Sequence, residues 1–194
     1  MAMNVYDFDK TISAKDSTAC FVRYCALRYP RVLLTLPGTG VAAVGMALRI
    51  ISKTQFKEYM YRFLRHVPDV DVAVKAFWDG GSCPIHNWYR EAHRDDDIVI
   101  SASPEFLLKP ICERLGIRRL IASRVDPQTG KYTGLNCDCA EKARRFRQEL
   151  PDVVPDKFYS DSVKDAPMAE ISAQAALVRG ERLLPWPGSE GANG

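Results

Sequence analysis

Short apolar runs, each ending at a polar residue, recur along the chain and predict buried strands. Four of these runs and the residues that follow them are Asn4–Tyr6 before Asp7, Ile98–Ile100 before Ser101, Leu120–Ala122 before Ser123, and Phe158–Tyr159 before Ser160. Ala175–Val178 is a fifth apolar run. Runs of this length, separated by sequence of helical pattern, are typical of parallel strands covered on both faces. The pattern therefore predicts an α/β fold with a mainly parallel sheet.

Two helices and a hairpin are predicted between these strands. Pro104–Leu115 has helical periodicity, with Ser103 as the expected N-cap and Gly116 as the residue that ends the helix. Ala140–Leu150 has the same periodicity and stops before a proline. The segment Arg124–Gly134 contains Pro-Gln-Thr-Gly and is expected to turn back on itself as a hairpin.

The interval between the first two strands is far longer than one crossover helix requires. Most of it is helical in pattern, so we expect an inserted helical cap over residues 17–92. The core of the fold is then formed by residues 1–16 and 93–184. Residues 185–194 are rich in Gly, Pro and Ser and are expected to form a flexible tail.

One stretch of the expected cap carries no charge over its whole length, from Val32 to Leu48. It is slightly shorter than the ~18 residues expected of a membrane-crossing segment. Pro37-Gly38-Thr39-Gly40 also interrupts it. Two interpretations remain open: two buried cap helices joined by a turn, or a surface that contacts lipid.

Composition narrows the class of protein. The chain has 194 residues, of which 46% are hydrophobic and 26% charged, so it can form a core. Its net charge of +3, without a long basic block, does not indicate a nucleic-acid partner. Six cysteines without a CxxC pair, and an amino terminus without an apolar signal core, favour reduced thiols and a cytoplasmic location. If the lipid interpretation is right, the protein lies at the inner face of a membrane.

Polar side chains that follow the predicted strands are the candidate site, because ligands bind at the carboxyl ends of strands in open α/β sheets. Four carboxylates crowded at one edge would repel each other without a cation. Oxygen ligands suit a hard ion, and Mg²⁺ with several retained waters is expected. A hydroxyl and an ammonium beside such a cluster would bind a phosphate. The residues are Asp7, Asp9, Ser101, Ser103, Lys142, Asp161 and Asp165.

The first two carboxylates, at i and i+2 after a strand, suggest a division of work. Asp7 can attack phosphorus and form an aspartyl-phosphate. Asp9 can protonate the leaving alkoxide and then deprotonate the hydrolytic water. Lys142 and Ser101 would hold phosphoryl oxygens, so that catalysis consists mostly of positioning and charge stabilisation.

These residues form four motifs in order: Asp7-Phe-Asp9-Lys-Thr11, the serine after Ile98–Ile100, Lys142, and Ser160-Asp161-Ser-Val-Lys-Asp165. Together they resemble the motifs of haloacid-dehalogenase-superfamily phosphatases, in the order and spacing of the phosphoserine-phosphatase-like branch. The resemblance covers about residues 4–180 and implies a Rossmann-like core with a helical cap.

The resemblance also implies a role for each matching residue. Asp7 is the expected nucleophile and Asp9 the acid/base. The expected Mg²⁺ ligands are the side chains of Asp7 and Asp161 and the backbone carbonyl of Asp9. The expected phosphate contacts are Ser101, Lys142 and Thr11. Asp165 is expected to support the metal ligands or Lys142.

A narrower similarity links the chain to phosphatidylglycerophosphatase C and its bacterial relatives. It rests on Phe21-Val-Arg-Tyr24, the apolar stretch Pro30–Pro37, Ile121-Ala-Ser-Arg124 and Tyr159-Ser-Asp-Ser162. The resemblance implies a lipid phosphate as substrate. The chain departs from the wider family at Cys139-Ala140, where relatives often carry Gly-Glu ahead of the lysine.

Several assignments keep an alternative. The phosphate contact after the second strand is Ser101 or Ser103, of which we favour Ser101. Lys142 could instead be a solvated helix lysine, and Asp165 a helix N-terminal carboxylate. Asp16 is a candidate for substrate contact, since the resemblance places an acidic residue there against a substrate amine, or it is a helix cap.

The function predicted from these residues is Mg²⁺-dependent hydrolysis of a phosphomonoester. The substrate is a small metabolite such as phosphoserine or a lipid phosphate. A phosphotransferase or mutase would use the same aspartyl-phosphate, and a non-catalytic phospho-ligand-binding protein could share the fold.

Overall fold

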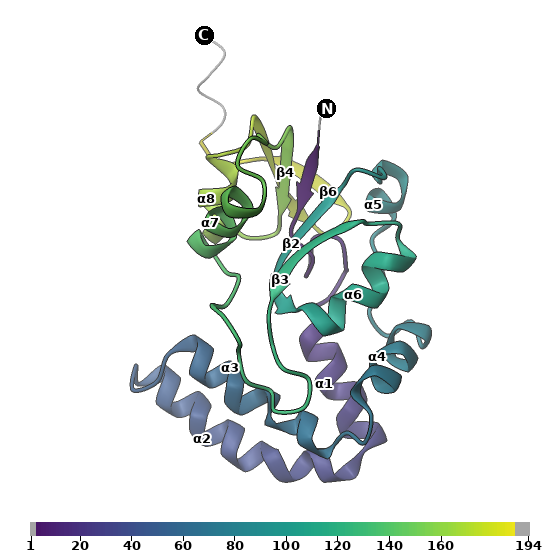
Figure 1. Ribbon diagram of the computed structural model, residues 1–194, viewed down its shortest axis with the longest axis vertical. Coiled ribbons are helices and arrows are strands. Elements are labelled where there is room, and N and C mark those ends of the chain that lie inside the picture. Colours follow the sequence, from purple (N-terminus) through teal and green to yellow (C-terminus); the bar gives the residue numbers. More distant parts are fainter. Residues whose placement is uncertain (1–2, 189–194) are drawn as a thin grey trace.

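A six-stranded sheet forms the centre of the molecule in the computed structural model, which describes residues 3–188 (Figure 1). The strand order is β3-β2-β1-β4-β5-β6, in which the first five strands are parallel and β6 pairs antiparallel with β5. The strands are β1 Asn4–Tyr6, β2 Ile98–Pro104, β3 Arg119–Ser123, β4 Lys157–Ser160, β5 Gln174–Arg179 and β6 Arg182–Pro185. The predicted α/β fold with a mainly parallel sheet is confirmed.

The last strand, β6, was not predicted from the sequence. Its four residues include only two large apolar side chains, which is shorter than the apolar run that marks a buried strand. All four residues are exposed in the structure. It follows β5 through Gly180 and Glu181, and Gly180 has a φ of +60°, which suits a two-residue hairpin. Pro185, expected in the flexible tail, belongs to this strand, and residues 189–194 of that tail lie outside the described part of the chain.

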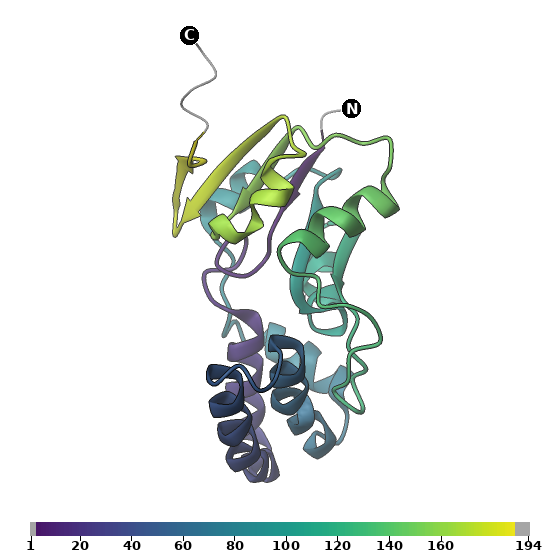
Figure 2. The ribbon, with the colours of Figure 1, turned by 90° about the vertical axis from the view of Figure 1, so that its left-hand side faces the viewer.

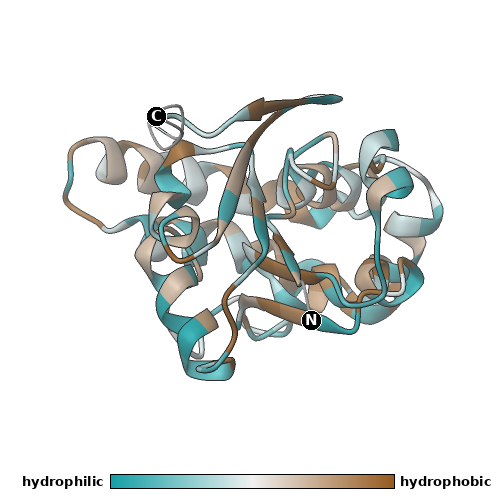
Figure 3. Cartoon of the chain, turned by 90° about the horizontal axis from the view of Figure 1, so that it is seen from above, coloured by the Kyte–Doolittle hydropathy of each residue, from teal (hydrophilic) through white to brown (hydrophobic). Residues whose placement is uncertain are grey.

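Helices cover both faces of the sheet, and alternate residues of each strand face different helices (Figures 1 and 2). In β1, Val5 packs with Phe146 of α7, whereas Tyr6 packs in a second cluster with Tyr89 and Leu107 of α5 and α6. Seen from above, the central strands are mainly hydrophobic (Figure 3). This period-two alternation of buried residues gives the core two apolar layers. The helices are α5 Asn87–Ala92, α6 Glu105–Arg114, α7 Ala140–Glu149 and α8 Ala166–Ala169, the last preceded by the 3₁₀ turn Val163–Asp165.

The helices between β1 and α5 form a separate layer at the far end of the molecule from the termini (Figure 2). We call α1 to α4 the cap helices. They are α1 Ser17–Arg28, α2 Leu36–Ala47, α3 Lys53–Tyr61 and α4 Val70–Asp79, with 3₁₀ helices at Pro30–Thr35 and Arg62–His66. Helix α5, in the expected cap range 17–92, lies beside the sheet. The division into residues 1–16 plus 93–184 and 17–92 stays a prediction.

The start of α6 differs from the prediction. Strand β2 continues through Ser103 to Pro104, which pairs with Ser123 of β3 after a shift in register. Pro104 is the N-cap of α6 and no side chain caps this helix, so Ser103 does not have the capping role expected of it. Gly116 does end the helix as predicted, with a φ of +75°.

The uncharged stretch Val32–Leu48 is not a pair of buried helices joined by a turn. Pro37 lies in the first turn of α2, where its missing N–H costs nothing, and the helix continues through Gly38 and Gly40. Most large apolar side chains of the stretch are exposed, and Val32 and Ala42 are its buried residues. No helix within residues 3–188 combines the length and the apolar character that crossing a bilayer requires.

The segment after β3 leaves the sheet and reaches the cap helices (Figure 1). Its predicted hairpin is present as a turn, with one bridge between Val125 and Tyr132. Gly130 has a φ of +73° and lies so close to Tyr61 that a Cβ atom there would be 2.6 Å from the Tyr61 carbonyl oxygen. The backbone N–H of Tyr132 also donates to Glu58 of α3 at 3.0 Å. Residues 124–139, which we call the cap-contacting loop, therefore connect the core to α3.

Candidate active site

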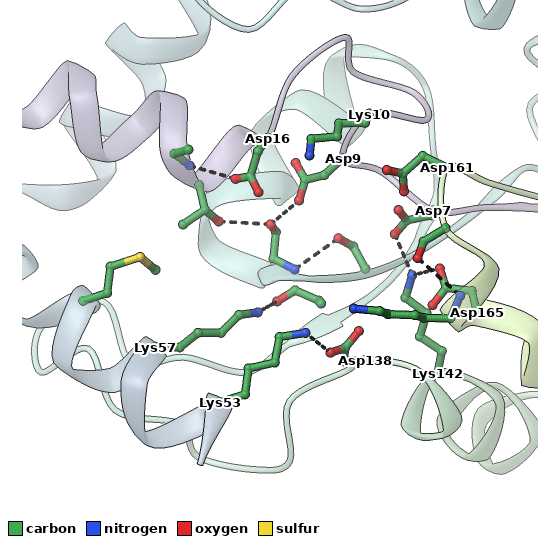
Figure 4. A pocket seen from close by; sticks show the side chains of 18 of the residues that line it. Asp7, Asp9, Lys10, Asp16, Lys53, Lys57, Asp138, Lys142, Asp161 and Asp165 are labelled. Atoms are coloured by element: carbon green, nitrogen blue, oxygen red, sulfur yellow. Dashed lines mark hydrogen bonds and ion pairs between the residues drawn. The ribbon is translucent and has the colours of Figure 1, made fainter. Parts of the chain in front are cut away.

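A cavity of about 570 Å³ lies between the carboxyl edge of the sheet and the cap helices (Figure 4). Its size is that of an ordinary small-molecule site. The core contributes mainly charged and hydroxyl groups, whereas the cap adds apolar side chains and two lysines. The principal lining residues are Asp7, Asp9, Asp16, Ser101, Lys142, Asp161 and Asp165 from the core, and Met46, Lys53, Phe56, Lys57 and Tyr61 from the cap.

A buried lysine and two carboxylates form the floor of the cavity. Asp7 follows β1, Lys142 lies in the first turn of α7, and Asp165 ends the 3₁₀ turn after β4. The Lys142 ammonium donates to Asp7 Oδ1 and to Asp165 Oδ2, both at 2.7 Å. Ser160 donates to the same Asp165 oxygen at 2.7 Å. Lys142 is therefore not a solvated helix lysine, and Asp165 holds it in place.

Burial and ion pairing act in opposite directions on these groups. Burial raises the pKa of Asp7 to about 7, although Lys142 beside it lowers the pKa. Burial lowers the pKa of Lys142, but Asp7 and Asp165 raise it more, and the net shift is upward. The ammonium thus stays charged. Because one lysine serves two buried carboxylates, a further cation near Asp7 would favour its ionised form.

Asp9 is fixed by the start of α1 and by β2. Its Oδ1 accepts from the backbone N–H of Ser17 at 2.6 Å, and its Oδ2 accepts from the hydroxyl of Ser103. The pKa of Asp9 is raised, mainly by burial and further by the charge of Asp16. The hydrogen bonds from Ser103 and Ser17 act in the opposite direction and lower it. A carboxyl whose pKa is raised, yet which is held by hydrogen bonds, suits a group that both gives and takes a proton.

The two serines of β2 have different partners. Ser103 donates to Asp9, so the Thr18 hydroxyl, 3.0 Å away, must donate to Ser103. The Ser101 oxygen accepts from the Ser103 backbone N–H at 3.1 Å, and its proton has no acceptor among the described residues. This arrangement supports Ser101 as the group that donates to a phosphate in the cavity. Ser103 is instead a positioning residue for Asp9.

Replacing Ser103 by alanine is expected to reduce kcat roughly tenfold to a hundredfold, because hydrogen bonds to charged groups contribute about 1.5–3 kcal/mol. The change also removes a bond that lowers the pKa of Asp9. The pKa attributed to Asp9 in a pH–rate profile should therefore rise. Ser172→Ala, which removes a hydroxyl bonded to the Met168 carbonyl outside the cavity, is the control. An unchanged profile in the Ser103 variant would contradict this role.

Asp161 is the carboxylate best placed to bind a cation. It follows β4 and lines the cavity (Figure 4). Its carboxylate accepts no hydrogen bond from the residues that the structure describes, and burial raises its pKa. Within residues 3–188, no three His, Cys, Asp or Glu side chains converge as metal ligands. Asp7 and Asp161 are the cavity carboxylates that could hold a cation, and Mg²⁺ would suit so small a set of protein ligands because it retains several waters.

Thr11 does not lie where the sequence interpretation placed it. It is buried and is not part of the cavity lining, so it does not face a bound phosphate. Its hydroxyl accepts from the backbone N–H of Asp161 at 2.9 Å. The first and fourth motifs are joined by this bond, which fixes the loop that carries Asp161.

The departure from the family pattern before Lys142 has a local explanation. Cys139 is the N-cap of α7 and has a φ of +51°, a region that favours glycine. A side chain in this conformation costs of order 1–3 kcal/mol. The backbone nevertheless turns as a glycine would allow, so Lys142 still enters the cavity from the first turn of α7.

Several polar residues of the cavity region were missed in the sequence, among them two lysines of α3. Lys57 of α3 donates to the Ala102 carbonyl and to Asn136 Oδ1, both at 3.1 Å, and Lys53 forms an ion pair with Asp138. Burial lowers the pKa of Lys57. The i, i+4 spacing of the two lysines was the available signal, since it places them on one helix face. Asp16 both caps α1, accepting from Ala19 at 2.8 Å, and lines the cavity, so its two interpretations are compatible.

The chain combines an α/β core, a helical cap and an acidic cavity with a buried lysine. This combination is typical of one class of hydrolases. The family model described as haloacid dehalogenase-like hydrolase matches residues 5–170. The chain belongs to this family.

Two proteins with assigned names are similar to the chain in sequence. A probable phosphatase of Mycobacterium tuberculosis is 35% identical over 96 residues, covering 46% of this chain and 33% of that protein. A histidinol-phosphatase of Neisseria meningitidis is 26% identical over 116 residues, covering 52% of each. The chain thus spans a third to a half of these relatives.

Solved structures resemble the chain over most of its length. A Bordetella pertussis protein with unknown function superposes with a TM-score of 0.70 at 20% identity, covering 90% of this chain and 89% of that one. A phospho-aspartyl intermediate analogue of phosphoserine phosphatase gives a TM-score of 0.57 at 14% identity, covering 90% and 84%. At these identities the likeness establishes the fold.

Proposed function

We propose that the protein is a Mg²⁺-dependent phosphomonoester hydrolase that acts through an aspartyl-phosphate on Asp7. The observation that carries the proposal is the environment of this carboxylate. Its Oδ1 is bonded to Lys142, whereas its Oδ2 accepts no hydrogen bond from the described residues. One oxygen is thus oriented by the ammonium, and the other is available at the floor of a cavity to attack phosphorus.

The chain's own groups account for both halves of the reaction. An Asp7 oxygen bonds to phosphorus as the ester P–O bond breaks, and Asp9 gives its proton to the leaving alkoxide. Asp9 then takes a proton from water, whose oxygen displaces Asp7 and releases phosphate. Lys142 and Ser101 would hold phosphoryl oxygens during both transfers.

The residues that would hold Mg²⁺ are Asp7 and Asp161 through their carboxylates and Asp9 through its carbonyl. When bound, the ion would neutralise charge on the carboxylates and on the phosphoryl group. Asp165 would act indirectly, by keeping Lys142 beside Asp7.

The lining on the cap side of the cavity supports a substrate whose organic group, the part that carries the phosphate, is at least partly apolar. Met46, Phe56 and Met60 line it there, and the opposite side holds the charged groups. A lipid phosphate fits this division of the lining. Phosphoserine and histidinol phosphate, suggested by the names of the similar proteins, are the soluble alternatives.

Phosphate release from a panel of phosphomonoesters tests the proposal. We expect turnover with Mg²⁺, at least a hundredfold loss after EDTA treatment, and recovery when Mg²⁺ is restored. The panel contains an aryl phosphate, phosphoserine, histidinol phosphate and a phosphatidate. Transfer of the phosphoryl group to an added alcohol in preference to water would indicate a phosphotransferase. Phosphate binding without release from any compound would identify a binding protein and overturn the proposal.

A further inference from the structure

Exposed apolar side chains are concentrated on one part of the cap. Eight of the fourteen large apolar residues exposed in the described part of the chain lie between residues 27 and 50. Leu27 is 77% exposed, Val41 75%, Ile50 74% and Leu34 72%. The eight, which we call the apolar cap surface, are Leu27, Leu33, Leu34, Leu36, Val41, Val44, Leu48 and Ile50. Monomeric soluble proteins rarely expose apolar residues in such a group unless the surface binds something.

Helix α2 is apolar on both of its sides, which differ in the size of their side chains. Val41 and Val44 are three apart and Leu48 follows four later, so these exposed residues share one side of the helix. Ala42 is buried, and Gly45 lies against Ile51, where an added Cβ would be 3.6 Å from the Ile51 side chain. Small residues therefore pack α2 onto the cap, and the larger ones point outward. Helix α2 forms the outer edge of the molecule, at the end opposite the termini (Figure 1).

The charged residues of the segment that carries this surface all have one sign. From Ser17 to Lys57 the sequence contains six basic residues and no aspartate or glutamate. Two of the six, Lys53 and Lys57, face the cavity. The other four, Arg23, Arg28, Arg31 and Arg49, are exposed and form no ion pair with a carboxylate of the described residues. Elsewhere in the described residues, Arg94, Arg114, Arg144 and Arg145 pair with acidic side chains, whereas Arg118, Arg147 and Arg182 do not.

We propose that the apolar cap surface docks on the surface of an anionic lipid bilayer. Leu, Val and Ile side chains would enter the boundary between headgroups and acyl chains, and the unpaired arginines would bind lipid phosphates. An anionic bilayer satisfies both features at once, since it offers apolar depth and uniform negative charge. A second copy of this chain would bring the same arginines together, which like-charge repulsion disfavours.

Docking in this way would bring the bilayer close to the cavity. Met46 of α2 lines the cavity, and Leu48 and Ile50, which belong to the apolar cap surface, follow it directly. A lipid headgroup could then reach the cavity with its acyl chains left in the bilayer. This consequence rests on the proposed function, whereas the docking itself does not.

Vesicle flotation of the full chain tests the docking. We expect binding to vesicles of phosphatidylglycerol and phosphatidylcholine, at least tenfold weaker binding to phosphatidylcholine alone, and weakening by salt. The variant Val41→Ser/Val44→Ser/Leu48→Ser should lose at least tenfold in the partition coefficient. Its matched control is Leu135→Ser/Val154→Ser, which changes exposed apolar residues outside the surface and should bind normally.

The arginines are tested separately. Arg28→Gln/Arg31→Gln/Arg49→Gln should weaken vesicle binding about a hundredfold, because each basic residue near an anionic surface contributes about 1 kcal/mol. Arg118→Gln/Arg147→Gln/Arg182→Gln removes the same charge from exposed positions outside the surface and should have little effect. Equal losses in both variants would show non-specific attraction and overturn the proposal.

Two further outcomes would also overturn it. One is a wild-type chain that remains folded by circular dichroism but does not float with anionic vesicles. The other is a dimer, detected by light scattering, that the serine variant converts to a monomer, which would assign the surface to a second copy. Turnover of a soluble aryl phosphate by the serine variant separates the two proposals, since it reports on the cavity and should be unchanged.

Discussion

Replacing Asp7 by asparagine is expected to lower kcat for any substrate of this protein by about four orders of magnitude or more, as loss of a catalytic nucleophile does in other hydrolases. The amide has nearly the same shape as the carboxylate, but it cannot attack phosphorus. The Lys142 ammonium can still donate to the amide oxygen, so the fold should persist. Phosphate release at saturating substrate and Mg²⁺ measures the effect.

The matched control for this variant is Asp126→Asn. Asp126 lies in the turn of the cap-contacting loop, outside the cavity lining, where it accepts from the backbone N–H groups of Gln128 and Thr129. It should keep nearly normal turnover. Mass spectrometry after rapid acid quenching adds a second measurement, because wild-type protein should carry a phosphoryl group on Asp7 that hydroxylamine removes, and the variant should carry none. Retained Mg²⁺-dependent turnover by Asp7→Asn would end the assignment of Asp7 as nucleophile.

Lys142→Met is expected to reduce both activity and stability. It leaves Asp7 and Asp165 buried without their shared cation, and breaking a buried ion pair in this way costs about 3–5 kcal/mol. Without the lysine, which lowers the pKa of Asp7, burial should raise the pKa of this carboxyl further in the folded state. The loss of stability should therefore be larger at pH 8 than at pH 5, where protonation relieves the repulsion. Urea unfolding at the two pH values measures it.

Two companion variants make this prediction specific. Lys109→Met removes an exposed lysine of α6 and should change the free energy of unfolding by less than about 0.5 kcal/mol. Lys142→Met/Asp165→Asn removes one of the two stranded charges and should recover part of the stability, without recovering activity. A double variant as unstable as Lys142→Met, or a loss independent of pH, would contradict the electrostatic explanation.

The parts of the fold that the sequence predicted are those with a local signal. Each strand of the parallel sheet has a short apolar run, and the polar residue after it marks the edge where ligands bind. Asp7, Lys142 and Asp165 could thus be assigned to one site before their contacts were visible. Their ion pairs, both at 2.7 Å, join residues 135 and 23 positions apart.

Features that depend on packing between distant segments were not predictable. Ser103 has a strong helix-capping signal, but its hydroxyl bonds to Asp9 because β2 runs on to Pro104 after a register shift. Lys57 enters the cavity only because α3 packs beneath the sheet edge and the cap-contacting loop. The uncharged stretch around α2 was consistent with burial as well as with exposure, since an apolar sequence does not reveal whether neighbours cover it.

The cap-contacting loop has a consequence for how molecules enter and leave. Three contacts tether it to α3: Lys57 with Asn136, Lys53 with Asp138, and Tyr132 with Glu58. A cap joined to the core only by its two chain connections could rotate far from the core. In this protein such a rotation would require the three contacts to break at the same time. Substrate and product should instead pass through an opening of the cavity that is always present. The cap helices would then move only by small amounts, and the opening would not close.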